Sequence, residues 1–364
     1  MRPAAPASRS GLTGGPGGKV APRLKIVGLG GGHGLAASLA ALRTVTGELT
    51  AIVTVADDGG SSGRLRREFG VLPPGDLRMA LAALCGDDEW GTTWSRVVQH
   101  RFGAAAAGGP GKSNAAAGAS EPIPGGCGEL AGHAVGNLLI VALWDLLGDT
   151  VAGLDWVGRL LGTGGRVLPM AAVPLDIVAE VVGADPARPD DVTVVRGQAE
   201  CAITPGRVRS ITLEPANPPA VPQAVDAVLD ADWVIFGPGS WFTSVLPHLL
   251  VPDLVNALRE THARRMVVVN LAPQPGETDG FSPHKHLEVL AQHAPDLKVD
   301  VVLADTGSME SAGVAGTGTL TDLEHAAGAL GARLVLADVA MGDGTPRHDP
   351  RLLAGEYAKV LKGE

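Results

Sequence analysis

The sequence KIVGLGGGHGL occupies residues 25–35, and a run rich in alanine and leucine follows it to about Leu42. The beginning of this stretch is typical of a β-strand, the alanine and leucine run is typical of a helix, and glycines fill the turn between them. The spacing of the glycines matches neither G-x-G-x-x-G nor G-x-x-x-x-G-K-[ST], so no standard nucleotide-binding fingerprint is met.

The glycine turn is nevertheless suited to an anion. Glycines let backbone N–H groups approach an anion closely and adopt positive φ, and the first turn of a helix adds unpaired N–H donors and a positive dipole end. A phosphate or pyrophosphate is therefore the expected ligand, with Gly31, Gly32, His33 and Gly34 as contact residues. A tight strand-to-helix turn that binds nothing is the alternative interpretation.

Composition limits the class of protein. A length of 364 residues corresponds to one large or two modest domains, and an apolar content of 45% is ample for a buried core. The formal net charge of −10 argues against a general binder of nucleic acid or of anionic membranes. No apolar stretch reaches the length of a membrane span. Cys85, Cys127 and Cys201 are too far apart to form a metal motif or a disulfide framework, which favours a reducing cytoplasm.

The organisation of the chain is predicted from its composition and periodicity. Residues 1–22 are expected to form a disordered tail, residues 23–350 an α/β domain, and residues 351–364 a helical C-terminal tail. Residues 103–128 contain few large apolar side chains, so they are expected to form a flexible insertion. The stretch 167–212 alternates apolar and polar residues in short runs, which indicates an antiparallel excursion or an irregular cap.

Strand-like runs alternate with helical segments along the chain, and this alternation predicts the fold class. The expected strands are residues 25–29, 49–55, 232–236, 266–270, 299–304 and 334–337. We predict an α/β fold with a mostly parallel, Rossmann-like sheet and helices on both of its faces. In such sheets a ligand binds in a crevice beyond the carboxyl ends of the strands, so the loops at these ends are the candidate site.

The loop after the second predicted strand reads ADDGGSSGR at residues 56–64. Asp57 and Asp58 are suited to a divalent metal or a ribose hydroxyl, and the serines, glycines and arginine that follow are suited to a phosphate. A solvated turn is the alternative, because Asp-Gly and Ser-Gly are common turn pairs. The density of small residues favours a functional loop.

Two later strands also end in polar loops. GPGS at residues 237–240 is another glycine turn that leads into a helix, and NLAPQPGETDG at residues 270–280 carries an acidic pair. Together with the two earlier loops, they predict one shared crevice at four strand ends.

Two predicted helix starts also carry polar residues. PPGD at residues 73–76 opens a helix for which Asp76 is the expected N-cap. GHAVGN at residues 132–137 opens another, in which His133 is expected to cap or pack. Asn137 is suited either to a hydrogen bond with a ligand amide or hydroxyl or to a structural role.

Several of these motifs together resemble one family. In chain order they are GGGHGL at 30–35, TVADDGGSSGRL at 54–65, VLPPGDLR at 71–78, GHAVGN at 132–137, GPGS at 237–240 and QPGETDG at 274–280. By this resemblance the chain is identified as a member of the gluconeogenesis-factor family, the YvcK-type proteins that bind UDP-N-acetylglucosamine. That family is related to the CofD-type 2-phospho-L-lactate transferases. The resemblance extends from about Leu24 to the C-terminus, apart from residues 103–128, and the chain departs from it at His33, where threonine is usual.

The resemblance implies a crevice for UDP-N-acetylglucosamine or a related UDP-sugar, and a cytoplasmic role in cell shape and cell-wall morphogenesis under gluconeogenic growth. It also implies a ligand contact for Arg347, through the segment RHD at residues 347–349. A binding or regulatory protein without a catalytic residue is favoured over an enzyme. The alternative is a phospho-group transferase, in which Asp57 or Asp58 would hold Mg²⁺.

The same interpretation is compatible with a cell-wall or regulatory protein partner and with a homodimer, whereas neither nucleic acid nor a membrane span is expected. The candidate ligand-binding residues are Gly31, Gly32, His33, Gly34, Asp57, Asp58, Ser61, Ser62, Arg64, Asn137, Gly237, Gly239, Ser240, Asn270, Gln274 and Arg347.

Overall fold

The structure is a computed structural model that describes residues 24–103 and 128–363, apart from residues 186, 202, 275–276, 279–280, 315 and 317. The expected N-terminal tail, residues 1–22, lies outside the described residues. So does the expected insertion, except for its boundary residues 103 and 128.

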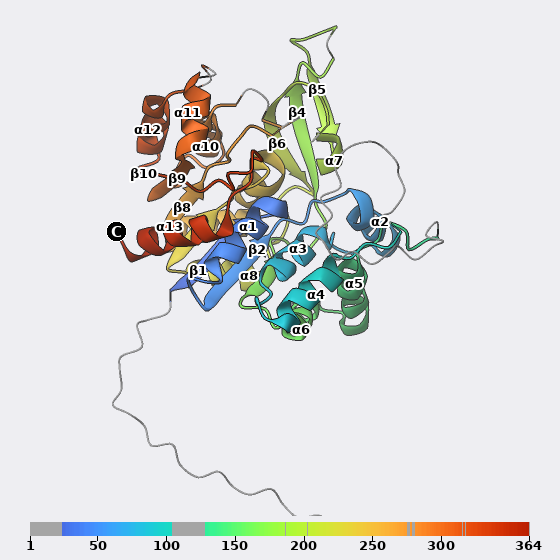
Figure 1. The fold of residues 1–364 in the computed structure, drawn as a ribbon. Coiled ribbons are helices and arrows are strands. Elements are labelled where there is room, and N and C mark those ends of the chain that lie inside the picture. The colour runs from blue at the N-terminus through green and yellow to red at the C-terminus, as the bar shows by residue number, and fades with distance from the viewer. Residues whose placement is uncertain are drawn as a thin grey trace, which may run out of the picture.

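A seven-stranded sheet forms the centre of the molecule, and its strand pairs are all parallel (Figure 1). The order is β10-β9-β8-β7-β1-β2-β3. The strands are β1 (Lys25–Gly30), β2 (Glu48–Val53), β3 (Arg166–Pro169), β7 (Trp233–Phe236), β8 (Arg264–Val268), β9 (Val301–Asp305) and β10 (Arg333–Ala337). The predicted mostly parallel, Rossmann-like α/β fold is thereby confirmed.

The strand order reverses between β1 and β7. The chain places β2 and β3 on one side of β1 and later adds β7, β8, β9 and β10 on the other side. The strands of this sheet are apolar runs because helices cover them; β7 and β9, for example, are buried at every residue. The loops at the carboxyl ends of β1 and β7 therefore flank the topological switch point, which is where ligands bind in open α/β sheets.

Helices surround the sheet (Figure 1). α1 (Gly32–Leu42) follows β1 directly, and α13 (Pro350–Lys362) packs against it. In this contact the buried hydroxyls of Ser38 and Tyr357 hydrogen bond at 2.8 Å, so the C-terminal helix is part of the layer beside α1. The other helices are α2 (Gly60–Phe69), α3 (Gly75–Ala83), α4 (Glu89–Gln99), α5 (Val135–Leu147), α6 (Thr150–Leu161), α7 (Gln198–Cys201), α8 (Pro222–Leu229), the π-helix η1 (Trp241–Val245), the 3₁₀-helix η2 (Leu246–Leu250), α9 (Pro252–Glu260), α10 (Pro283–His293), α11 (Thr306–Val314) and α12 (Leu320–Ala329).

A second, three-stranded sheet stands apart from the main one (Figure 1). Its strands are β4 (Asp176–Val182), β5 (Val192–Arg196) and β6 (Arg207–Glu214), and both of its strand pairs are antiparallel. Alternate residues of β4 are buried, which explains the alternating pattern read from the sequence. The antiparallel excursion is thus the alternative that the structure adopts, while residues 166–169 belong to the main sheet.

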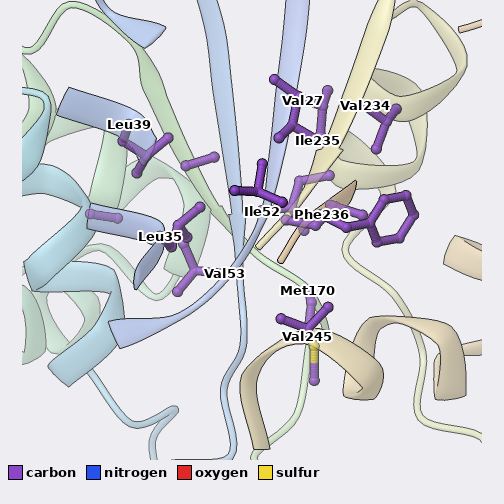
Figure 2. Packing of buried hydrophobic residues seen from close by; sticks show 14 of the residues in the cluster. Val27, Leu35, Leu39, Ile52, Val53, Met170, Val234, Ile235, Phe236 and Val245 are labelled. Atoms are coloured by element: carbon purple, nitrogen blue, oxygen red, sulfur yellow. The ribbon is translucent and has the colours of Figure 1, made fainter. Parts of the chain in front are cut away.

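The hydrophobic core packs α1 against the central strands of the sheet. Figure 2 shows side chains of α1, of the central strands and of η1 gathered in one cluster. Leu35, Ile52, Phe236 and Val245 are among them, and each is at most 1% exposed. Among the described residues, no helix combines the length and the apolar character that crossing a membrane requires.

Candidate functional site

A cavity of about 630 Å³ lies at the topological switch point. The loops after β1, β7 and β8 line it, together with the segment that precedes α13 and with single residues of α3 and α7. The sequence-predicted residues among its lining are Gly31, Gly32, His33, Gly34, Gly239, Ser240, Asn270, Gln274 and Arg347. The structure therefore brings residues of three of the four predicted loops together.

The glycines of the β1–α1 turn serve different purposes. A Cβ atom on Gly31 would lie 2.5 Å from the Asp76 carboxylate, and one on Gly34 would overlap the carbonyl oxygen of Pro238. Both positions therefore require glycine because of neighbouring protein atoms. Gly32 differs, because its φ is +59° and a Cβ atom there would meet nothing within 4 Å. Since Gly32 also lines the cavity, the empty space above it is available to a ligand.

The first turn of α1 offers N–H donors to the cavity. Gly31 occupies the N-cap position and has no side chain to cap the helix, and the Asp76 carboxylate of α3 accepts a hydrogen bond from the Gly32 N–H group. The N–H groups at the start of a helix have no acceptor within it, and they carry the positive end of the helix dipole. The turn is therefore a suitable place for an anion.

The β7–η1 loop is less suited to an anion than the β1–α1 turn. The Asn270 side chain accepts a hydrogen bond from the Gly239 N–H group at 2.9 Å and donates one to the Gly239 carbonyl at 2.8 Å. The Ser240 hydroxyl donates to the carboxylate of Glu277, whose pKa burial raises. The N–H and carbonyl groups of Gly239 and the hydroxyl of Ser240 therefore already have partners, and the Glu277 carboxyl group lies beside the loop. Gly237 has φ of +69° and does not line the cavity.

Four buried polar atoms of the cavity lining have no hydrogen-bond partner among the described residues. They are Asp76 Oδ2, Gln198 Oε1, Gln274 Oε1 and His348 Nε2. Leaving a buried polar atom unpaired costs roughly 1–3 kcal/mol, so such atoms are rare in folded proteins. Their concentration around one cavity makes them candidate hydrogen-bond partners for water or for a polar ligand.

Asp76 is the acidic residue among the lining residues that the structure describes. It lies in the first turn of α3, whose N-cap position belongs to Pro74, so the expectation that Asp76 caps this helix is wrong. The carboxylate instead accepts a hydrogen bond from the backbone of Gly32. Burial and the nearby charge of Asp57 raise the pKa of Asp76 to about 7. Asp76 is therefore partly protonated near neutral pH.

His348 and Arg347 reach the cavity from the segment before α13. Burial lowers the pKa of the His348 imidazole to about 4, so the ring is neutral near pH 7. Arg347 donates to Thr345 Oγ1 at 3.0 Å and to Asp343 Oδ2 at 2.9 Å, and its side chain is 57% exposed. Arg347 is the one permanently cationic residue among the described residues of the lining.

The remaining predicted residues do not line the cavity; they are Asp57, Asp58, Ser61, Ser62, Arg64 and Asn137. Most of them have structural contacts elsewhere. Asp58 accepts a hydrogen bond from the Ala199 N–H group at 2.9 Å, and Arg64 donates to the Ala131 carbonyl at 2.9 Å. Ser62 is buried next to Gly75.

Ser61 and Asn137 belong to a buried polar cluster beside α2. The Asn137 amide donates to Ser61 Oγ at 3.0 Å, and Ser61 also hydrogen bonds with His133 Nδ1 at 3.1 Å. Arg78 donates to Asn137 Oδ1 at 2.9 Å. The cluster connects α2, α3 and α5 and satisfies its own hydrogen bonds.

The two aspartates predicted to hold Mg²⁺, Asp57 and Asp58, have different surroundings. Asp58 is turned to the backbone of α7, whereas the charge of Asp57 acts on Asp76 beside the cavity. The described residues contain no group of three or more histidine, cysteine or acidic side chains arranged around a metal position. One or two carboxylates suffice for Mg²⁺ when substrate phosphates and water complete its octahedral shell.

The fold and the cavity define a Rossmann-like α/β protein with a glycine-lined polar cavity at its topological switch point. The family described as "2-phospho-L-lactate transferase CofD" matches residues 26–332, and the chain belongs to this family.

Relatives within the family share most of the chain. A Mycobacterium tuberculosis protein named "Putative gluconeogenesis factor" is 51% identical over 338 residues, which cover 93% of this chain and 89% of that protein. The "Gluconeogenesis factor" of Halalkalibacterium halodurans is 34% identical over 278 residues, or 76% of each chain. A crystal structure of a UPF0052-family protein from Bacillus halodurans has a TM-score of 0.74 and 30% identity, and covers 92% of this chain and 98% of its own. These findings confirm the resemblance inferred from the motifs.

Proposed function

We propose that the protein binds a UDP-sugar, with UDP-N-acetylglucosamine as the expected ligand. In this proposal it acts in the cytoplasm as a gluconeogenesis factor that supports cell shape and cell-wall morphogenesis. The observation that carries the proposal is the set of four unpaired, buried polar atoms around a glycine-lined cavity. The cavity volume of about 630 Å³ lies within the usual range for small-molecule sites.

The diphosphate is assigned to the β1–α1 turn. Gly32 leaves space above the turn, and the N-terminus of α1 supplies N–H donors. Arg347 lies at the same cavity and can bind phosphate oxygens through its guanidinium group. The β7–η1 loop is the less favourable place for the diphosphate, because Asn270 already accepts the hydrogen bond of the Gly239 N–H group.

The uridine and the acetamido sugar are assigned to the neutral polar side chains of the cavity. Gln198, Gln274 and His348 each have an unpaired atom that can hydrogen bond with an amide or hydroxyl of the ligand. Specificity is expected to come from these residues, since leaving them unpaired with a wrong ligand retains their desolvation cost.

A second candidate function is a phospho-group transferase. The observation in its favour is the interaction between Asp57 and Asp76 next to the β1–α1 turn. With both carboxylates ionised, this pair could hold Mg²⁺, which would neutralise phosphate charge. The N–H groups at the start of α1 would hold the phosphate oxygens.

Calorimetry and product analysis distinguish the two functions. UDP-N-acetylglucosamine should bind saturably with or without Mg²⁺, and chromatography should recover it intact after a long incubation. UMP, UDP and UDP-glucose serve as comparison ligands. UMP and UDP lack the sugar, and UDP-glucose lacks the acetamido group. Absence of binding would overturn the proposal. Steady release of UMP over many turnovers, which requires cleavage of the diphosphate bond, would favour the phospho-group transferase, whereas steady release of UDP would indicate transfer or hydrolysis of the sugar and would also contradict binding without turnover.

Replacing Arg347 with alanine is expected to weaken UDP-N-acetylglucosamine binding by about 1.5–3 kcal/mol, the range for hydrogen bonds to charged groups. Arg64→Ala is the matched control, because Arg64 contacts the Ala131 carbonyl and does not line the cavity. Isothermal titration of both variants, with melting curves, provides the measurement. Equal affinity of Arg347→Ala and the wild type would show that Arg347 does not contact the diphosphate.

A further inference from the structure

The short helix α7 brings a side chain from the segment of the small sheet to the cavity. α7 follows β5, and Gln198, its first residue, lines the cavity. The side-chain oxygen of Gln198, Oε1, is buried and has no hydrogen-bond partner among the described residues. A helix of four residues is held only weakly by its own hydrogen bonds, so contacts from other segments must fix the position of Gln198.

Asp58, which follows β2, holds the start of this helix. Its carboxylate accepts a hydrogen bond from the Ala199 N–H group at 2.9 Å, although the two residues are 141 positions apart in the chain. Gly197 has φ of +94°, and a Cβ atom there would overlap Asp58 Oδ2. The backbone on either side of Gln198 is therefore packed against the Asp58 carboxylate, and this contact sets the place of the Gln198 side chain.

Hydrogen-bond counting fixes the orientation of the Gln198 amide. The Ser240 hydroxyl donates its single hydrogen to Glu277, so the contact between the Ser240 and Thr243 hydroxyls uses the hydrogen of Thr243. Thr243 Oγ1 can then only accept, and Gln198 Nε2 donates to it at 3.4 Å. The amide oxygen is consequently the atom that Gln198 leaves for a group in the cavity.

We propose that Gln198 accepts a hydrogen bond from an N–H or O–H group of the ligand, and that Asp58 is the positioning residue that holds Gln198 in place for it. The inference rests on the proposed binding of a UDP-sugar, since it describes how one side chain of that cavity recognises the ligand. An amide oxygen requires a donor, so the uracil imide, a hydroxyl or the acetamido N–H group satisfies it and a phosphate oxygen does not. Asp58 acts here through the backbone of α7 and not as a ligand of Mg²⁺.

Gln198→Met tests the ligand contact, because methionine has a similar length and lacks the amide oxygen. Isothermal titration with UDP-N-acetylglucosamine should show roughly tenfold weaker binding, since a donor of the bound ligand is left unpaired. A loss confined to this ligand identifies the acetamido N–H group as the donor. A loss shared with UDP-glucose but not with UDP identifies a sugar hydroxyl, and a loss shared by all three identifies the uridine. Wild-type affinity of Gln198→Met for UDP-N-acetylglucosamine would overturn the proposal.

Two substitutions of Asp58 separate positioning from metal binding. Asp58→Asn keeps an oxygen that can accept the Ala199 N–H group, so it should bind UDP-N-acetylglucosamine as the wild type does, with or without Mg²⁺. Asp58→Ala removes the acceptor and should bind roughly three- to tenfold more weakly, on the scale of one hydrogen bond. If Asp58 acts through Gln198, Asp58→Ala should add no further loss to Gln198→Met. Additive losses, or an Asp58→Asn variant as weak as Asp58→Ala, would overturn the positioning role.

Hydrogen exchange without ligand distinguishes a failure of this inference from a failure of the proposed function. The amides of residues 197–201 should exchange faster in Asp58→Ala than in the wild type and in Asp58→Asn. Glu200→Gln, at an exposed position of the same helix, is the control and should leave the exchange close to that of the wild type. If the wild type binds no nucleotide sugar while the exchange changes as expected, the proposed function fails and Asp58 still positions Gln198. Unchanged exchange in Asp58→Ala would overturn the inference whichever ligand binds.

Discussion

The Asp76→Asn variant is expected to be more stable than the wild type by about 4 kcal/mol at about pH 8, and to lose this advantage at about pH 4. The pKa of Asp76 is about 7 in the folded protein against an ordinary value of 3.8. Between these values the folded state retains a proton that the unfolded state releases. Wild-type stability therefore falls as the pH rises from about 4 to about 7, and asparagine removes this loss because it does not ionise.

Urea unfolding at several pH values measures this effect as the difference between the two proteins. Asp145→Asn, on an exposed position of α5, controls for the loss of a carboxylate as such. Asp57→Asn should produce part of the same change, since the charge of Asp57 contributes to the raised pKa of Asp76. Parallel curves of stability against pH for the wild type and Asp76→Asn would contradict the expected burial of the charge.

The protonation of Asp76 also separates the two proposed functions. A UDP-sugar held by the α1 turn brings negative charge toward Asp76, so binding without metal should favour the protonated form and weaken as the pH rises through about 7. A Mg²⁺ ion at Asp57 and Asp76 needs ionised carboxylates, so metal-dependent binding should strengthen over the same pH range. The sign of the pH dependence therefore identifies the form of the site.

Sequence reasoning located the crevice because its main signal is local. Each strand is a short apolar run followed by glycine or polar residues, and parallel strands bring their carboxyl ends to one edge. This reasoning predicts that the loops that begin at Gly30, Gly237 and Asn270 lie side by side. It could not place residues 56–64, because strand order is not encoded locally, and from Gly60 onward these residues belong to α2 and not to a loop. β2 lies on the far side of β1 from β7, and the segment after β2 contacts α5 through Ser61 and α7 through Asp58.

The cavity residues that sequence reasoning missed come from outside the strand ends. Gln198 belongs to a short helix after β5, and His348 precedes α13. Asp76 lies at the start of a helix, where an acidic residue is ordinarily explained as a helix cap. What distinguishes these residues is a buried atom without a partner, and that property arises only when distant segments pack together. The RHD segment was a usable signal for His348, since it adjoins Arg347.

The largest expected effect of a substitution in the β1–α1 turn is that of Gly34→Ala, which should destabilise the protein by about 3 kcal/mol, at the upper end of the usual cost of overpacking. The added methyl group would overlap the carbonyl oxygen of Pro238 and lie 2.5 Å from Gly239 Cα. Both are backbone atoms of the neighbouring loop, which Asn270 fixes through two hydrogen bonds. The loop therefore cannot yield as a flexible side chain would.

Gly32→Ala, two residues away in the same turn, is the matched variant. Its methyl group meets no protein atom within 4 Å, so the expected loss of stability is only roughly 1–2 kcal/mol, the cost of an alanine at φ of +59°. Because that methyl group occupies the space assigned to the diphosphate, binding of UDP-N-acetylglucosamine should nevertheless fall at least roughly tenfold, equivalent to about 1.4 kcal/mol. Chemical denaturation and isothermal titration of both variants separate packing from ligand contact. If Gly32→Ala binds the ligand as the wild type does, the diphosphate does not lie on this turn. If Gly34→Ala is no less stable than Gly32→Ala, the β1–α1 turn and the β7–η1 loop are not in the close contact described.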